Sequence, residues 1–126
     1  MSEPENLLFT VDHEWVRVEG GTVIIGITDY AQEALGDIVF VQLPTPNDVV
    51  SANSTLSEVE STKSVSDIYA PVSGRVIKVN ETLSTSPELM NSSPYGDGWI
   101  AVLEMSDEHE LENLLTLEEY QKLIDN

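Results

Sequence analysis

A small, mainly β fold of the barrel or sandwich type, with short helices at its periphery, is predicted by this sequence. Many short segments have the composition of strands and are separated by turns rich in Gly, Pro and Asn. Helical spacing of apolar residues is confined to a segment near 29–35 and to the C-terminal part. The length of 126 residues suits one domain. We therefore expect a single domain over 1–126, with a β core at about 14–105 and a helical extension at about 107–125.

Strands account for most of the predicted core. The segments 14–19 and 22–27 are joined by Gly20-Gly21, a two-residue connection of the kind that closes antiparallel hairpins. A second hairpin is predicted around Lys63, and the segment 84–98 has the Pro, Ser, Asn and Gly content of a long loop with one helical turn. The remaining strands are predicted at 38–41, 55–60, 64–69, 75–79 and 99–105.

Two regions carry helix signals. Asp29 begins a short helical pattern in which Gln32 completes a capping box, and Gly36 is placed to end the helix in a left-handed conformation. Thr116 and Glu119 fit a second capping box near the C-terminus. Apolar residues there follow helical spacing, at Leu111, Leu114, Leu115, Leu117, Tyr120 and Ile124.

The net charge of -18 is the strongest global feature of the chain. An acidic surface repels nucleic-acid phosphates and anionic lipids, so neither a nucleic-acid partner nor a membrane-surface role is expected. The same surface suits partners that carry basic patches, although high solubility alone explains it equally well.

Several kinds of site and targeting segment are excluded by what the sequence lacks. The absence of cysteine excludes disulfides, thiolate zinc sites and cysteine nucleophiles. No apolar run approaches the ~20 residues of a transmembrane helix. The start, Met-Ser-Glu-Pro-Glu, lacks the basic and apolar regions of a signal peptide. A cytoplasmic monomer is the expectation.

Signatures of catalysis and metal binding are missing as well. The two histidines, His13 and His109, have neither metal-ligand nor triad spacing. A structural role is favoured for His13 and a surface position for His109. Acidic residues gather at 107–112 without the order of a calcium loop, which favours a solvated helix face. No catalytic residue and no metal site are therefore predicted.

Lys63 is one of three lysines in the chain and lies at the predicted tip of a hairpin. A catalytic lysine must lose its proton, which burial or a neighbouring cation promotes. Here the neighbours are Glu58, Glu60 and Asp67, whose carboxylates stabilise the protonated amine instead. Lys63 is therefore a poor nucleophile of its own but a well-exposed amine for another enzyme to acylate.

The segments around this lysine resemble a known family. Glu60-Ser-Thr-Lys-Ser-Val-Ser-Asp67, followed by Tyr-Ala-Pro-Val-Ser-Gly74, is similar to the lipoyl-lysine hairpin of the glycine cleavage system H protein family. The resemblance extends in order over about residues 7–124. Its other segments are 13–20, 26–32, 35–41, 91–96 and 98–99.

This resemblance implies a lipoyl-domain-like barrel-sandwich hybrid of two antiparallel sheets that carries rather than catalyses. It implies lipoate attached covalently to Lys63 by a lipoate-attaching enzyme. The arm would take the aminomethyl group from glycine decarboxylase to aminomethyltransferase and pass electrons to dihydrolipoamide dehydrogenase. The cofactor would supply the redox chemistry, which agrees with the missing catalytic groups.

Four further residues are candidates for supporting roles. Glu60 and Asp67 bracket Lys63 and are expected to help the attaching enzyme recognise it. The cargo is an amine, so a carboxylate beside a hydrophobic wall is the expected receptor in the pocket of the arm, and Glu14 next to Trp15 fits that description.

The chain departs from the family pattern at a few positions. Asn47 and Asn53 stand where glycine is frequent, and asparagine is the next most tolerant residue of left-handed turns. Thr62 and Ser64 replace the small apolar residues that often flank the lysine, and they also disfavour a biotin carrier, whose lysine is usually flanked by methionines. Two alternatives stay open, namely an H-like donor of lipoyl groups to other 2-oxoacid dehydrogenase complexes and an unmodified acidic binding domain.

Overall fold

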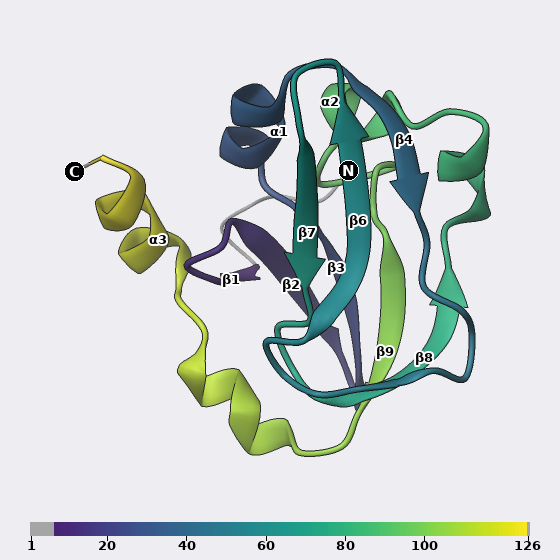
Figure 1. Cartoon of the computed structure of the whole chain (residues 1–126). Coiled ribbons are helices and arrows are strands. Elements are labelled where there is room, and N and C mark those ends of the chain that lie inside the picture. Colours follow the sequence, from purple (N-terminus) through teal and green to yellow (C-terminus); the bar gives the residue numbers. More distant parts are fainter. Residues whose placement is uncertain (1–6, 126) are drawn as a thin grey trace.

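The computed structural model describes residues 7–125 and contains two antiparallel sheets that face each other (Figure 1). The larger sheet has the strand order β1-β2-β3-β9-β8-β5, and the smaller one has the order β4-β6-β7. The predicted mainly β fold of two antiparallel sheets is confirmed. The strands are β1 Leu8–Phe9, β2 Glu14–Glu19, β3 Thr22–Ile27, β4 Ile38–Gln42, β5 Val49–Val50, β6 Thr55–Ser61, β7 Val65–Tyr69, β8 Gly74–Val79 and β9 Ala101–Met105.

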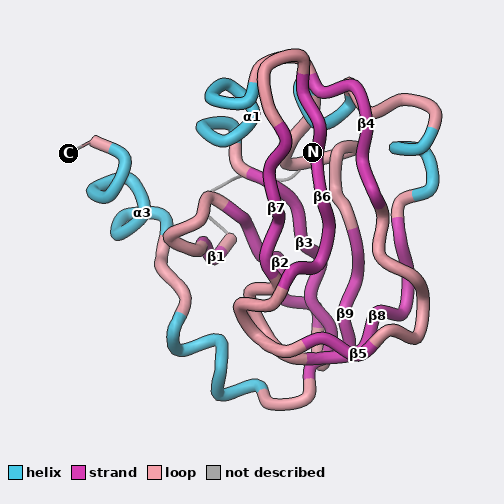
Figure 2. Tube along the Cα trace, viewed as in Figure 1, coloured by secondary structure: helices cyan, strands magenta, loops and turns pink. Residues whose placement is uncertain are grey.

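Short helical segments lie at the edges of the sheets (Figure 2). They are α1 Asp29–Leu35, the 3₁₀ segments η2 Glu81–Ser84 and η3 Glu108–Asn113, α2 Leu89–Ser92 and α3 Leu117–Ile124. The predicted capping box of α3 is confirmed, because Thr116 and Glu119 bond reciprocally. The predicted start of α1 at Asp29 is confirmed, but the capping box expected with Gln32 is wrong, because Thr28 caps the helix by accepting from the Ala31 N–H. Among residues 7–125, no helix has both the length and the apolar character needed to cross a membrane.

The core fills the space between the sheets. One cluster joins β3, β4, β6, β7 and α2, and a second joins β2, β3, β8 and β9. A third cluster lies on the outer face of β2, where Phe9, Trp15 and Tyr120 pack together. The rings of Phe9 and Tyr120 are stacked with centroids 4.8 Å apart, so α3 is held against the larger sheet. The first half of β2, from Glu14 to Val16, is consequently buried on both faces.

Left-handed backbone occurs where the chain turns between these elements. Gly36 has a φ of 84° at the C-terminus of α1, as predicted for the end of that helix. Asn47 and Asn53 have φ values of 79° and 71°, in agreement with the expectation that these asparagines occupy left-handed turns. His13 also has a positive φ of 70°, which the sequence did not indicate.

Candidate functional site

Lys63 lies at the exposed tip of the hairpin formed by β6 and β7. The tip is closed by the backbone, since the Ser61 N–H donates to the Ser64 carbonyl over 2.8 Å. The Ser61 hydroxyl oxygen accepts from the backbone N–H groups of Lys63 and Ser64, each at 3.1 Å. The turn is therefore fixed by bonds that leave the amine of Lys63 unused.

The hairpin tip rests against the C-terminal end of α1 (Figure 1). The Thr62 N–H donates to the Asp37 carbonyl over 3.0 Å, which joins the tip to the connection between α1 and β4. A Cβ atom at Gly36 would lie 3.0 Å from Cε of Lys63, so the stem of the lysine crosses bare backbone there. Gly36 thus ends the helix and also leaves room for the lysine.

Asn91 holds the α1–β4 connection in place, a role that the sequence did not reveal. Its Nδ2 donates to the Gly36 carbonyl over 2.8 Å and to Gln32 Oε1 over 3.0 Å. Its Oδ1 accepts from the Ile38 N–H over 2.9 Å. Because the hairpin tip bonds to the same connection at Asp37, Asn91 indirectly positions Lys63. In the sequence Asn91 stood only as a loop asparagine and as the first residue of the family-like segment 91–96, and neither indicates which groups it bonds.

The carboxylates near Lys63 share one face of the hairpin. Glu58 pairs with Asp67 and Glu60 pairs with Val65, and residues directly opposite each other point to the same side of a sheet. Glu58 and Glu60 are two residues apart and so point to that side as well. The opposite face carries the buried Val59, which places the acidic face towards solvent. The structure thus brings Glu60 and Asp67 onto the same face of the hairpin, with Glu60 nearer to the tip than Asp67.

Within residues 7–125, no carboxylate lies within 4.0 Å of the Lys63 amine, and no cluster of His, Asp and Glu side chains could hold a metal ion.

His109 is exposed on η3, as expected. His13 has a structural contact, since its Nδ1 lies 2.8 Å from the Tyr120 hydroxyl, which in turn lies 2.8 Å from Thr28 Oγ1. Burial lowers the pKa of His13, with Asp12 opposing the shift.

Glu14 is the most deeply buried carboxylate of the described chain, with 1% of its surface exposed. Its Oε1 accepts from the Thr10 hydroxyl at 2.9 Å, and its Oε2 accepts from the Tyr69 N–H at 2.9 Å. It therefore links the larger sheet to the end of β7 that is remote from Lys63. Burial raises the pKa of Glu14 from 4.5 to about 7, although both hydrogen bonds favour the ionised form. The side chain is not a solvated strand residue.

Trp15 does not form a wall beside Glu14, and that part of the sequence-based expectation is wrong. The indole Nε1 donates to the Pro94 carbonyl over 2.8 Å, and the ring packs in the outer cluster with Phe9. Neighbouring residues of a strand point to opposite faces, so Glu14 faces β7 while Trp15 faces away from it. A Cβ at Gly26 would lie 2.6 Å from the Trp15 ring, which explains why the cross-strand partner of this tryptophan is a glycine.

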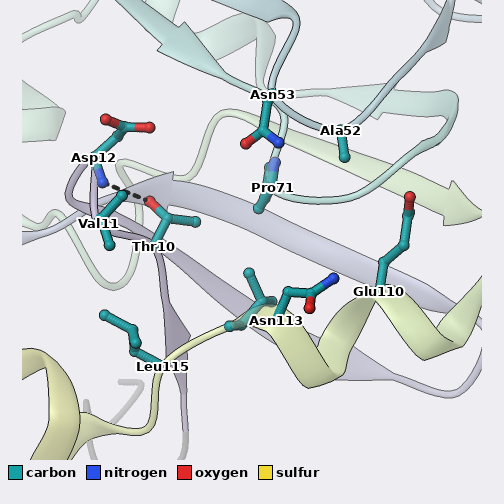
Figure 3. A pocket seen from close by; sticks show the side chains of 10 residues that line it. Thr10, Val11, Asp12, Ala52, Asn53, Pro71, Glu110, Asn113 and Leu115 are labelled. Atoms are coloured by element: carbon teal, nitrogen blue, oxygen red, sulfur yellow. Dashed lines mark hydrogen bonds between the residues drawn. The ribbon is translucent and has the colours of Figure 1, made fainter.

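A cavity of about 200 Å³ lies at the end of the hairpin opposite to Lys63 (Figure 3). It is bounded by the turn between β1 and β2, the turn before β6, and η3. Thr10 lines it and accepts from the Asp12 N–H over 3.3 Å, while its hydroxyl donates to Glu14. The cavity thus approaches Glu14 from the side away from the lysine.

Comparisons with known proteins agree with these observations. A model of the family "Glycine cleavage H-protein" matches residues 7–126. The chain is 51% identical over 125 residues to the glycine cleavage system H protein of Listeria monocytogenes serotype 4a, covering 99% of this chain and 100% of that one. It is 54% identical over 124 residues to the one from Anoxybacillus flavithermus, covering 98% of each.

A solved structure matches the fold over the same extent. The crystal structure of a glycine cleavage system H protein from Mycobacterium marinum is similar with a TM-score of 0.88 and 41% sequence identity. The match covers 98% of this chain and 100% of that chain. Both the sequence and the two-sheet fold therefore lead to the same assignment. The chain belongs to the glycine cleavage H-protein family.

Proposed function

We propose that this chain is the lipoyl-lysine carrier of a glycine cleavage system. Lipoate on Lys63 would receive the aminomethyl group at glycine decarboxylase and deliver it to aminomethyltransferase, with dihydrolipoamide dehydrogenase accepting the electrons. The observation that carries the proposal is an exposed lysine at a hairpin tip in a chain of the glycine cleavage H-protein family. When bound, lipoate supplies a disulfide that can be opened and re-formed, chemistry that no side chain of this cysteine-free protein offers.

The surroundings of Lys63 fit an attached lipoyl group. The amine is exposed and has no ion-pair partner among residues 7–125. The tip is held by Ser61 and by the bond from Thr62 to Asp37, so the lysine projects from a fixed base. Acylation would convert the amine into an amide without breaking any of these bonds. The protein would then contribute position and recognition, and no step needs a catalytic side chain.

Glu60 and Asp67 are proposed to mark the hairpin for the lipoate-attaching enzyme. Both carboxylates lie on the solvent face of the hairpin close to Lys63. An enzyme that binds an anionic carrier through basic residues would find them on the side from which it approaches. Their charges contribute to orientation and encounter more than to fold stability, because exposed charges interact weakly in water.

Glu14 is proposed as the receptor for the cationic amine of the cargo. Its carboxylate is hydrogen-bonded but takes part in no ion pair within residues 7–125, and an ammonium could replace the Thr10 hydroxyl at Oε1. We expect Glu14→Ala to leave lipoylation intact and to hasten loss of the aminomethyl group from isolated loaded protein. A rate of loss equal to that of the unchanged protein would reject this role for Glu14.

The carrier proposal is tested by decarboxylation of glycine labelled in its carboxyl carbon. Lipoylated protein is mixed with glycine decarboxylase, and the release of labelled carbon dioxide is measured. We expect release to depend on the lipoylated chain and to be lost with Lys63→Arg, which keeps the charge but cannot be acylated. A lipoylated chain that supports no release would contradict the proposal.

A further inference from the structure

A β-bulge in β4 turns two consecutive apolar side chains towards solvent. Ile38 pairs with Ser61 and Phe40 pairs with Glu60, so β4 advances two residues while β6 advances one. Val39 is 53% exposed and Phe40 is 50% exposed, whereas Ile38 is buried. Regular alternation would have turned one of these two side chains inward.

Phe40 continues across the sheet into a row of exposed side chains. It pairs with Glu60 on β6, and Glu60 pairs with Val65 on β7, which is 58% exposed. Residues paired in this way share a face of the sheet. We call Val39, Phe40 and Val65 the Phe40 patch. Val65 is two residues from Lys63, so the patch begins at the hairpin tip.

Neither edge protection nor core packing explains the patch. β4 is an edge strand, and a bulge is one device by which proteins discourage pairing of such edges. The usual companions of that device are charged side chains, and Val39 and Phe40 are the opposite. Exposed apolar residues are ordinary when scattered, but a group of them beside a functional residue is typical of an interaction site.

We propose that the Phe40 patch is the docking surface for the lipoate-attaching enzyme. This inference rests on the proposed function. The partner surface would be an apolar groove with a basic side chain placed to meet Glu60, the carboxylate in the middle of the row. The patch would supply buried apolar area at the centre of the contact, and the carboxylates would supply orientation.

The attaching enzyme is the occupant because it must reach the lysine itself. Nζ is separated from the backbone by a four-carbon stem, so the enzyme has to lie directly on the hairpin to use this amine. There the neutral amine attacks the carbonyl carbon of an activated lipoyl donor. The C–N bond forms, the activating group leaves with its bonding electrons, and nitrogen loses a proton. Enzymes that act at the far end of a lipoyl arm need no such close approach.

The patch is tested by the kinetics of lipoylation with a purified ATP-dependent lipoate-attaching enzyme, lipoate and ATP. Phe40→Thr retains a strand-forming residue and removes the ring. We expect it to raise the KM for the carrier roughly tenfold, with kcat and the thermal midpoint unchanged, because a large apolar contact is lost on binding only. Val49→Thr is the matched control: Val49 is 78% exposed on β5 of the other sheet, and its KM should change less than about twofold.

Three outcomes would overturn the inference. Equal KM values for lipoylation of Phe40→Thr and Val49→Thr would show that the attaching enzyme does not contact the patch. If Phe40→Thr had an unchanged KM as substrate of lipoylation but a raised KM as substrate of glycine decarboxylase, the patch would belong to a different partner. A dimer that dissociates on Phe40→Thr would assign it to a second copy of the chain. Failure of the unchanged chain to be lipoylated at all is a different result, because it would contradict the proposed function itself.

Discussion

The two ends of the β6–β7 hairpin place charged side chains in opposite environments, one exposed and one buried. At the tip, Lys63 is exposed, and its neighbouring carboxylates point to solvent. At the other end, beside Tyr69, the carboxylate of Glu14 is buried and both of its oxygens are hydrogen-bonded. The two sites are six residues apart along the chain from Lys63 to Tyr69, which is roughly 20 Å of extended strand.

This contrast indicates different tasks for the two ends of the hairpin: the tip presents Lys63 to other proteins, and the buried end holds the sheets in position. The tip is fixed by backbone bonds and by the clamp from Asn91, so its charged groups stay available to other proteins. At the buried end both oxygens of the Glu14 carboxylate are hydrogen-bonded within the protein, because an unsatisfied carboxylate there would be costly. Changes at the tip should therefore affect modification and leave stability alone, and changes at the buried end should do the reverse.

The largest effect is expected from Lys63→Arg. The guanidinium keeps the positive charge but stays protonated and cannot be acylated. Modification should be abolished, while the free energy of unfolding changes by less than ~0.5 kcal/mol because the side chain is exposed. Intact-mass measurement and urea unfolding test both parts. Lipoate on another lysine of this variant would remove Lys63 as the unique site.

Glu14→Gln should change stability in a pH-dependent manner. The pKa of Glu14 is raised from 4.5 to about 7, so the folded state binds more protons between these values than the unfolded state does. Stability due to protonated Glu14 is complete below pH 4.5 and is lost as the pH rises through 7. The glutamine of the variant does not titrate in this range. As the pH rises from below 4.5 to above 7, the free energy of unfolding of Glu14→Gln should therefore increase by about 3 kcal/mol relative to that of the unchanged chain.

Urea unfolding of both proteins at pH 4.5 and pH 8 measures this difference. The comparison with Glu14→Gln cancels the pH dependence of the other carboxylates, which both proteins share. A stability difference that is the same at the two pH values would show that Glu14 ionises normally in the folded chain.

Asn91→Ala should have an intermediate effect and should alter both stability and modification. It removes three hydrogen bonds, those with Gln32, Gly36 and Ile38. We expect a loss of about 1–3 kcal/mol of stability together with slower lipoylation, because the base of the tip is no longer held. If Asn91→Ala slowed lipoylation without a loss of stability, or lost stability without slower lipoylation, the bonds of Asn91 would not both stabilise the fold and position Lys63.

The smallest change is expected from replacing Glu60 and Asp67 together by lysine. Modification should slow several-fold because an exposed contact between charges is typically worth up to ~1 kcal/mol. The far-UV circular dichroism spectrum should not change, since both side chains lie on the solvent face of the hairpin. An unaltered rate would show that the attaching enzyme reads the shape of the hairpin alone.

Local patterns predicted the elements of the fold that depend on neighbouring residues. The Gly20-Gly21 hairpin, the strands around Lys63 and the capping box at Thr116 were all visible in the sequence, and all are confirmed. The two-residue strands β1 and β5 were missed, because they are too short to show a period. Their pairing depends on partners elsewhere in the chain.

Contacts between distant segments were the main source of error. Glu14 shares the strand face of Val16 and Val18, so alternation pointed inward, but its bond to Tyr69 comes from a residue 55 positions away. The outer face of β2 is covered by α3, which buries Trp15 where alternation alone would expose it. The clamp by Asn91 and the bulge at Val39 likewise depend on tertiary contacts.

The central claim is that Lys63 is a presented modification site. It is tested most directly by intact-mass measurement and peptide mapping of the chain produced in a host that attaches lipoate. We predict a mass increase of one lipoyl group, located on the peptide that contains Lys63. An unmodified chain, or a lipoyl group located on Lys78 or Lys122 instead, would contradict it.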